Sequence, residues 1–134
     1  MSRDASVTFL WGDDDYRFRL GIGELRQLQE KCGAGPYEIL VRIAGAVWRV
    51  DDLRETIRLG LIGGGMDATK ATQAIKRNFD QGGGLLQHVA PAKVILSAAL
   101  IGPPDEEVGK DEAPETATTE TVESSSPGST DPEQ

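Results

Sequence analysis

The sequence changes character after Ile101-Gly102, and this change limits the size of the folded domain. Residues 103–134 contain ten Asp and Glu and one Lys, and their only larger apolar residues are Val108 and Val122. Such a segment buries too little apolar surface to offset the entropy that it loses on ordering. We therefore predict one domain over residues 1–102, followed by a disordered acidic tail over residues 103–134 that is rich in Pro, Ser, Thr and Glu.

The charge of the predicted domain differs from that of the whole chain. The chain has a formal net charge of −8, whereas residues 1–102 hold twelve acidic and thirteen basic residues. A single cysteine, Cys32, cannot form an intrachain disulfide, which fits a reducing compartment. The N-terminus shows no signal-peptide pattern, and no apolar run approaches the roughly 18 residues of a membrane span. We expect a protein of the cytoplasm that binds no membrane.

Two runs of alternating apolar and polar residues, 7–11 and 16–20, are typical of β-strands. Gly12 and three aspartates lie between them, so the sequence predicts a β-hairpin. One face of this hairpin is polar and carries Arg17 and Arg19, whereas the opposite face is apolar. Its apolar face comprises Val7, Phe9, Trp11, Tyr16, Phe18 and Leu20. Because an isolated two-stranded ribbon is barely stable in water, the apolar face is expected to pack on other elements.

Apolar residues then recur at three- and four-residue spacing, which predicts a series of helices. The first begins at Ile22, and the second begins at Pro36, which lacks an N–H that a first turn does not use. Asp51 and Asp67 are predicted to cap the third and fourth helices. Glycines at 33, 63–65 and 82–84 are predicted to end three of them. The predicted buried faces carry Ile22, Leu25, Leu28 and Cys32; Ile39, Leu40, Ile43 and Val47; Leu53, Ile57 and Leu61; and Ala71, Ala74 or Ile75, and Phe79.

The segment 85–101 is the most apolar of the chain, and it contains Pro91. Either a helix kinks at Pro91, or a short turn ends at Ala90 and a new helix begins at the proline. The residues that follow are apolar around much of the helix circumference, which predicts a centrally packed helix. The predicted fold class is α+β, with an N-terminal β-hairpin followed by a compact bundle of four to five helices.

The glycine-rich segments raise the alternative of a nucleotide site. Gly60 and Gly65 have the separation of a phosphate-binding loop, but Met66 and Asp67 follow where Lys and Ser or Thr are needed. An aspartate at a helix start repels a phosphate. We interpret the glycines as helix terminators and expect no cofactor.

Catalytic and metal-binding patterns are weak. His88 and Cys32 are the single residues of their types, and nothing in the sequence brings them together. The run Asp13-Asp14-Asp15 lacks the alternating carboxylates and closing glutamate of a calcium loop, so we interpret it as a solvated turn. The sequence predicts neither an enzyme nor a metal site.

Nucleic-acid binding is a further alternative, because arginines recur along the domain. These are Arg17, Arg19, Arg42, Arg49, Arg54 and Arg58. The nearly neutral domain and the acidic tail both oppose phosphate binding. We interpret the arginines as a solvated face paired with Glu24, Glu38, Asp52 and Glu55, and we expect no nucleic acid as a partner.

The remaining features are typical of a protein-binding module. Aromatic residues, methionine and apolar residues beside the glycine breaks often serve at adaptable interfaces. The candidate partner-binding residues are Trp11, Trp48, Leu61, Ile62, Met66 and Phe79. The alternative interpretation of each is a core position.

Several motifs together resemble the small tail protein that is encoded among the tail genes of gene transfer agents and related siphophage-like elements of alphaproteobacteria. They are Phe9-Leu10-Trp11-Gly12-Asp13, Tyr16-Arg17-Phe18-Arg19-Leu20, residues 23–29, Gly35-Pro36, residues 48–52 and residues 55–65. The resemblance covers residues 7 to 102, and the block 48–65 is its most specific part. The sequence departs from the family at Pro91 and in the tail.

The resemblance implies one of two roles, because the family has been labelled both a tail assembly chaperone and a tail tube protein. A chaperone covers apolar stripes of the tape measure protein and is displaced by tube subunits, which keeps its partner soluble in the cytoplasm of the producing cell. A tube subunit polymerises in the particle tail, usually around strands that line an inner wall. One hairpin followed by helices favours the chaperone. Whether the chain forms a homo-oligomer stays open.

Overall fold

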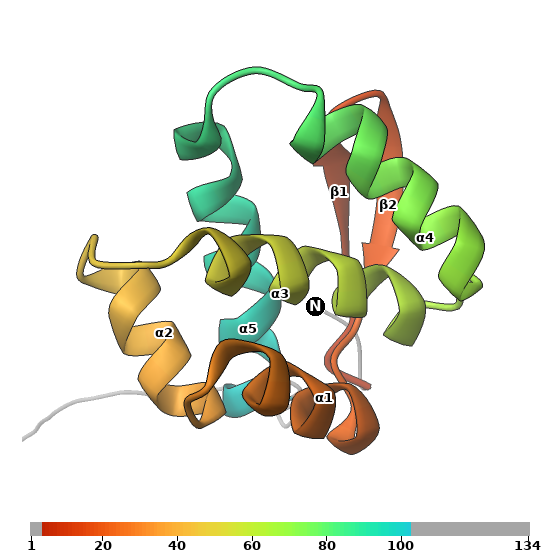
Figure 1. The fold of residues 1–134 in the computed structure, drawn as a ribbon. Helices are drawn as coiled ribbons and strands as arrows, with labels where there is room; N and C mark the ends of the chain where they lie inside the picture. The colour runs from red at the N-terminus through yellow and green to blue at the C-terminus, as the bar shows by residue number, and fades with distance from the viewer. Residues whose placement is uncertain (1–3, 103–134) are drawn as a thin grey trace, which may run out of the picture. The chain divides into compact units, whose positions relative to one another are not determined.

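The computed structural model describes residues 4–102, which form a β-hairpin followed by helices (Figure 1). In chain order the elements are β1 (Val7–Trp11), β2 (Asp14–Phe18), α1 (Ile22–Cys32), α2 (Pro36–Ala44), α3 (Val50–Gly63), α4 (Ala68–Ile75), the π-helical turn η1 (Lys76–Asp80), the 3-10 turn η2 (Leu85–His88) and α5 (Val89–Ile101). The predicted α+β fold class is confirmed. The predicted disordered tail, residues 103–134, lies outside the described residues.

The hairpin turn is shorter than the sequence pattern predicted. Trp11 pairs with Asp14 in the antiparallel register, so only Gly12 and Asp13 lie in the turn. Gly12 has a φ of 68°, which suits the first residue of a two-residue hairpin loop. The second strand therefore begins at Asp14 and not at Tyr16, because the glycine reverses the chain at once.

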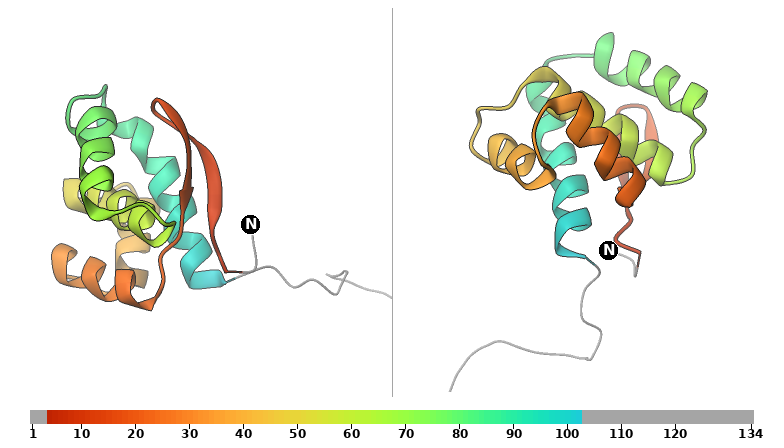
Figure 2. Two further views of the ribbon diagram at one scale, coloured as in Figure 1. Left: turned by 90° about the vertical axis from the view of Figure 1, so that its right-hand side faces the viewer. Right: turned by 60° about the horizontal axis from the view of Figure 1, so that its bottom comes forward.

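The aromatic side chains of the hairpin share one face, as predicted. The rings of Phe9 and Phe18 stack with centroids 4.7 Å apart, and Trp11 meets Phe18 edge to face at 6.2 Å. Phe18 is fully buried and Trp11 is 3% exposed. The hairpin lies along one side of the helices (Figure 2). Burial of these rings provides the packing that a two-stranded ribbon needs in water.

The central element is α3, which packs against α1, α2, α4, α5 and β2 (Figure 1). Its predicted core residues Leu53, Ile57 and Leu61 are all buried. A Cβ on Gly60 of the same helix would lie 3.1 Å from the Ile95 side chain of α5. Glycine at this position therefore allows α5 to approach α3 closely.

The end of α3 contacts the backbone that leaves β2. A Cβ on Gly63 or Gly64 would overlap the carbonyl oxygen of Arg19 or Arg17, respectively. The Arg19 N–H also donates a hydrogen bond to the Gly60 carbonyl oxygen at 2.9 Å. These glycines therefore permit contact between two backbones, in addition to ending the helix as predicted.

The start of α3 differs from the prediction. The helix begins at Val50, and Asp51 is not its N-cap. The N-cap is Arg49, whose N–H donates to Asp52 Oδ2 at 2.8 Å. The second aspartate organises this helix start because its carboxylate reaches back to the cap residue.

Three other predicted helix starts are confirmed, whereas two predicted core residues are exposed. The first helix begins at Ile22. The second helix begins at Pro36, and the carboxylate of Asp67 accepts a hydrogen bond from the Lys70 N–H at 3.0 Å. Ile22 and Val47 were expected on buried faces, but each is 68% exposed. Ile22 is the first residue of α1 and Val47 follows the end of α2, so neither lies where the helix contacts the core.

Pro91 does not kink a helix. The turn η2 precedes α5, which begins at Val89, so Pro91 is the third residue of the helix. The N–H groups of a first turn have no intrahelical acceptor, and the missing donor of proline costs nothing there. This arrangement matches the expected turn and new helix, except that the helix begins two residues before the proline.

Candidate partner-binding surface

Three of the six candidate partner-binding residues are core residues. Trp11, Leu61 and Phe79 are 3%, 1% and 4% exposed. Trp11 Nε1 donates a hydrogen bond to His88 Nδ1 at 3.0 Å, and the Phe79 ring stacks on the imidazole with centroids 4.5 Å apart. The expectation of an exposed patch is wrong for these three residues, because all three belong to the hydrophobic core.

The other three candidates, Trp48, Ile62 and Met66, are half-buried and pack against the core. Trp48 precedes α3, whereas Ile62 and Met66 lie at its opposite end. A helix of 14 residues is about 20 Å long, so the two groups are far apart. The six candidate residues therefore do not form one continuous surface.

The environment of His88 is that of a core side chain. Its Nδ1 accepts the hydrogen bond from Trp11, so the proton of the neutral ring resides on Nε2. Nε2 is buried and has no hydrogen-bond partner among the described residues. Burial lowers the pKa of His88, because the charged imidazolium loses its hydration. The ring is therefore neutral in the folded domain near pH 7.

The single cysteine is also a core residue. The Cys32 thiol is buried and donates a weak hydrogen bond to the Asp51 carbonyl oxygen at 3.4 Å. Burial, together with the negative charge of Asp52, raises the pKa of Cys32 to about 12. The thiol therefore stays protonated near neutral pH and is a poor nucleophile.

The predicted pairing of arginines with carboxylates is confirmed in part. Arg42 donates to both carboxylate oxygens of Asp52, at 2.9 and 2.6 Å, and two arginines of α3 pair with Glu55. These carboxylates are buried, so the pairs do not lie on a solvated face. On the hairpin, Arg17 pairs with Asp4. Most of the arginine charge is thereby neutralised within the domain.

Two further kinds of site have no counterpart in the described structure. Across residues 4–102, no three His, Cys, Asp or Glu side chains are grouped so that they could hold a metal ion. The helices seen in the same part of the chain are too short or too polar to cross a membrane.

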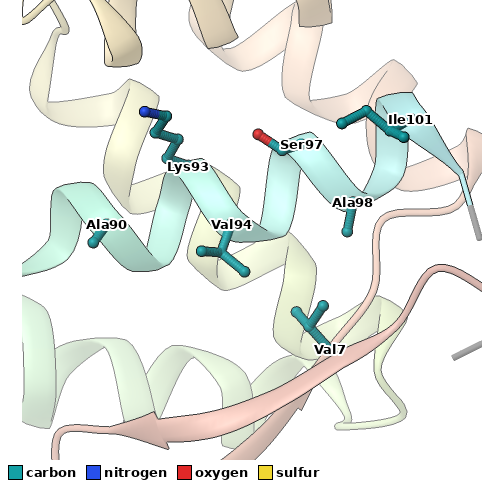
Figure 3. A pocket seen from close by; sticks show the side chains of 7 residues that line it. All are labelled: Val7, Ala90, Lys93, Val94, Ser97, Ala98 and Ile101. Carbon is teal, nitrogen blue, oxygen red and sulfur yellow. The ribbon is translucent and has the colours of Figure 1, made fainter. Parts of the chain in front are cut away.

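An apolar groove of about 390 Å³ lies between α5 and β1. Its lining residues are Val7, Ala90, Lys93, Val94, Ser97, Ala98 and Ile101. Val94 and Ala98 point towards Val7 across the hollow (Figure 3). Val94 is 46% exposed and Ile101 is 77% exposed. The prediction of a centrally packed last helix is therefore wrong for this face of α5, which remains open.

The other face of α5 packs in the core through Ala92, Ile95 and Leu96. Apolar residues on both faces explain why the sequence suggested complete burial. The sequence did show that Ala90, Val94 and Ile101 share one face of the helix. It could not show which face of the helix would pack against the hairpin and which would stay exposed.

The hairpin packed on helices defines a small α+β domain, and an open apolar groove lies beside α5. Residues 4–102 match the family described as phage tail tube protein, GTA-gp10. The chain belongs to this family and is therefore a tail protein of the phage and gene transfer agent type, as the motifs indicated. No curated protein and no solved structure matches the chain.

Proposed function

We propose that this protein is a tail assembly chaperone, which binds the tape measure protein and keeps it soluble until the tail tube forms. The observation that carries the proposal is the open apolar groove along α5. A partner that fills the groove removes side chains such as Val94, which is 46% exposed, from water, and this burial favours binding. A helical partner with an apolar stripe can bury that stripe in the groove. The burial keeps the partner soluble, because an exposed stripe drives self-association.

The distribution of strands supports this role. A tube subunit polymerises into stacked rings, usually around a β-barrel or sandwich whose strands line the inner wall. Within residues 4–102 the sheet has two strands, and its aromatic face packs on the domain's own helices. The two strands therefore leave little surface with which to line the inner wall of a tail tube.

In this proposal the protein acts by binding and not by catalysis, and it needs no cofactor, nucleic acid or membrane. It works in the cytoplasm of the producing bacterium, where tube subunits displace it from the tape measure protein. The net charge of −9 in residues 103–134 helps to keep the complex soluble.

A second candidate function is that of a structural tail tube protein, which the description of the family favours. This role predicts that the purified chain assembles into rings or tubes. It also predicts many copies in each finished tail.

Mass spectrometry of purified particles and of the cells that produce them tests the two roles. The chaperone is expected to be clear in the cells and absent, or present in traces, in mature particles. Multiple copies for each tail would contradict the proposal and support the tube subunit. Coexpression provides a second measurement, in which the soluble fraction of the tape measure protein is expected to rise. An unchanged soluble fraction would count against a chaperone.

A further inference from the structure

We infer that the outer edge of β1 is a dimerisation surface, at which the hairpins of two copies of this chain pair in antiparallel register around Phe9. Pairing at this edge joins two sheets of two strands into one sheet of four strands. The inference goes beyond the proposed function, because it concerns the association of the chain with itself and does not involve the tape measure protein.

The register of the hairpin shows which backbone groups of β1 point outwards. Trp11 and Asp14 flank a two-residue loop, so they form a pair that exchanges backbone hydrogen bonds. Along an antiparallel ladder such pairs alternate with pairs whose N–H and C=O groups point away from each other. Thr8 and Leu10 belong to the second kind. Within residues 4–102, no hydrogen bond is found for their outward backbone groups.

The outer edge of β2 is covered, which leaves the hairpin one free edge. The Asp15 N–H, which points outwards from β2, donates to the Asp14 carboxylate at 2.7 Å. The Arg17 carbonyl oxygen lies so close to Gly64 of α3 that a Cβ there would overlap it. Strand β2 also carries the charges of these three residues. The sheet can therefore pair with a further strand at β1 and not at β2.

The edge of β1 lacks the features that prevent pairing at natural sheet edges. Such edges commonly carry charged side chains, proline or a bulge. The strand Val7–Trp11 has the sequence VTFLW, and it pairs with β2 in continuous register. Thr8 is exposed, Leu10 is 69% exposed, and a groove separates β1 from α5 beside Val7. This edge is therefore open to a strand of another chain.

A second copy of β1 matches this edge. If the two strands run antiparallel about a two-fold axis at Phe9, Thr8 of one copy lies opposite Leu10 of the other. Each outward N–H then donates to an outward carbonyl oxygen of the second copy. Because β1 carries no charge, no like charges oppose each other across the axis. The exposed Leu10 side chain also gains a cross-strand neighbour in Thr8.

The folded state of β1 favours a second copy over a flexible segment of another protein. A flexible segment must lose backbone entropy when it becomes a strand, at a cost of about 1–2 kcal/mol for each residue. The second copy supplies a strand that its own hairpin already orders. Because each hairpin has one free edge, this pairing closes with two copies and does not continue into a ring or a tube.

The test measures the mass and the amide exchange of the full wild-type chain over a range of protein concentrations. Sedimentation equilibrium is expected to show a monomer that becomes a dimer as the concentration rises. Hydrogen exchange followed by NMR is expected to show that the Thr8 and Leu10 amides become protected with the same concentration dependence. The Phe9 amide is the internal control, because its pair with Tyr16 keeps it protected at every concentration.

Two substitutions at one position separate the backbone from the side chain. Leu10→Pro removes an outward N–H and leaves the hairpin bonds in place, whereas Leu10→Ala removes the side chain and keeps the N–H. In a symmetric dimer each change counts twice. We expect Leu10→Pro to raise the dimer dissociation constant at least about tenfold, and Leu10→Ala to raise it about threefold or less. Circular dichroism and the fluorescence of the buried Trp11 check that both variants fold.

Several results would overturn the inference. One is a wild type that stays monomeric at every concentration. Another is a dimer in which the Thr8 and Leu10 amides remain unprotected, because the copies would then meet at a different surface. An equal loss of dimer in Leu10→Ala and Leu10→Pro would assign the contact to the side chain. If Leu10→Pro does not fold, the exchange of the wild-type amides decides, since that measurement needs no variant.

Failure of this inference is distinct from failure of the proposed function. Protection of the two amides that appears when the tape measure protein is added, and not when the protein concentration rises, would give the edge to that partner. The second copy would then be excluded, whereas the chaperone role would stand. A dimer with protected amides that leaves the tape measure protein insoluble would confirm the edge and contradict the chaperone.

Discussion

Substituting Gly63 by Ala tests the backbone contact between α3 and the end of β2. The new Cβ would overlap the carbonyl oxygen of Arg19, and a backbone atom cannot turn aside as a side chain does. The chain at Arg19 must therefore move away from α3, which strains its hydrogen bond to the Gly60 carbonyl oxygen. The same change at Gly23 is the matched control, since a Cβ there meets nothing within 4 Å.

The two substitutions are expected to change stability in opposite directions. Overpacking costs about 1–3 kcal/mol, and loss of one hydrogen bond adds about 1 kcal/mol, so Gly63→Ala should lower the free energy of unfolding by about 3 kcal/mol. Gly23 is the second residue of α1, and alanine there is expected to stabilise by less than the roughly 0.5–1 kcal/mol that separates alanine from glycine in a helix interior. For a domain of this size, about 3 kcal/mol corresponds to a fall in melting temperature of about 15 °C.

Urea unfolding followed by tryptophan fluorescence measures both effects, because Trp11 is buried and Trp48 is half-buried. The urea midpoint should fall for Gly63→Ala and rise for Gly23→Ala. The m value, which is the slope of the unfolding free energy against urea concentration, should not change. A free energy of unfolding for Gly63→Ala within about 0.5 kcal/mol of the wild-type value would refute the argument. Surface substitutions that cause no clash commonly change the stability by no more than this.

Three further predictions concern the buried polar groups and the hairpin turn. Arg42→Met leaves the Asp52 carboxylate buried without its charged partner, so the free energy of unfolding should fall by about 3 kcal/mol. Adding Asp52→Leu removes the unpaired charge and should restore part of the lost stability. The urea midpoints of the single and double variants measure both effects. Because burial holds the pKa of His88 below its unfolded value of 6.5, the unfolded chain takes up the proton first, so the melting temperature should fall as the pH drops below about 6.5. His88→Gln, which keeps an acceptor for Trp11, should reduce that slope, and an unchanged slope would contradict the assignment. Hydrogen bonds from Tyr16 and Asn78 lower the pKa of Asp13 to about 2, so its contribution is present above about pH 4 and is lost towards pH 2. Asp13→Asn should therefore flatten the thermal stability profile in this acid range, and a profile as steep as that of the wild type would exclude Asp13 as its source.

Local patterns predicted the elements of this fold better than their contacts. The alternation in residues 7–11 and the four-residue spacing of Leu53, Ile57 and Leu61 each identified a buried face, because every face of this kind must be covered. The start of α3 was missed because aspartate is a common N-cap, whereas here the N-cap is Arg49, whose N–H donates a hydrogen bond to the Asp52 carboxylate.

The candidate partner-binding surface was harder to predict, for a physical reason. An aromatic residue such as Trp11 suits both a core and an interface, and the acceptor that holds it in the core, His88, lies far along the sequence. Whether Val94 is covered depends on where β1 meets α5, and no local pattern encodes that position. Sequence periodicity found the apolar faces, and tertiary packing decided which of them stayed open.

The contact between Trp11 and His88 spans 77 positions of the chain and joins the hairpin with the turn that leads into α5. The hairpin therefore leaves the ribosome long before α5 is synthesised. Its aromatic face stays exposed to solvent until the later helices have emerged and packed against it. Closing so long a loop is slow compared with pairing neighbouring helices. A chain that stops before Val89 would hold a finished hairpin and no way to complete its core, so partial translation products of this protein should aggregate or be degraded.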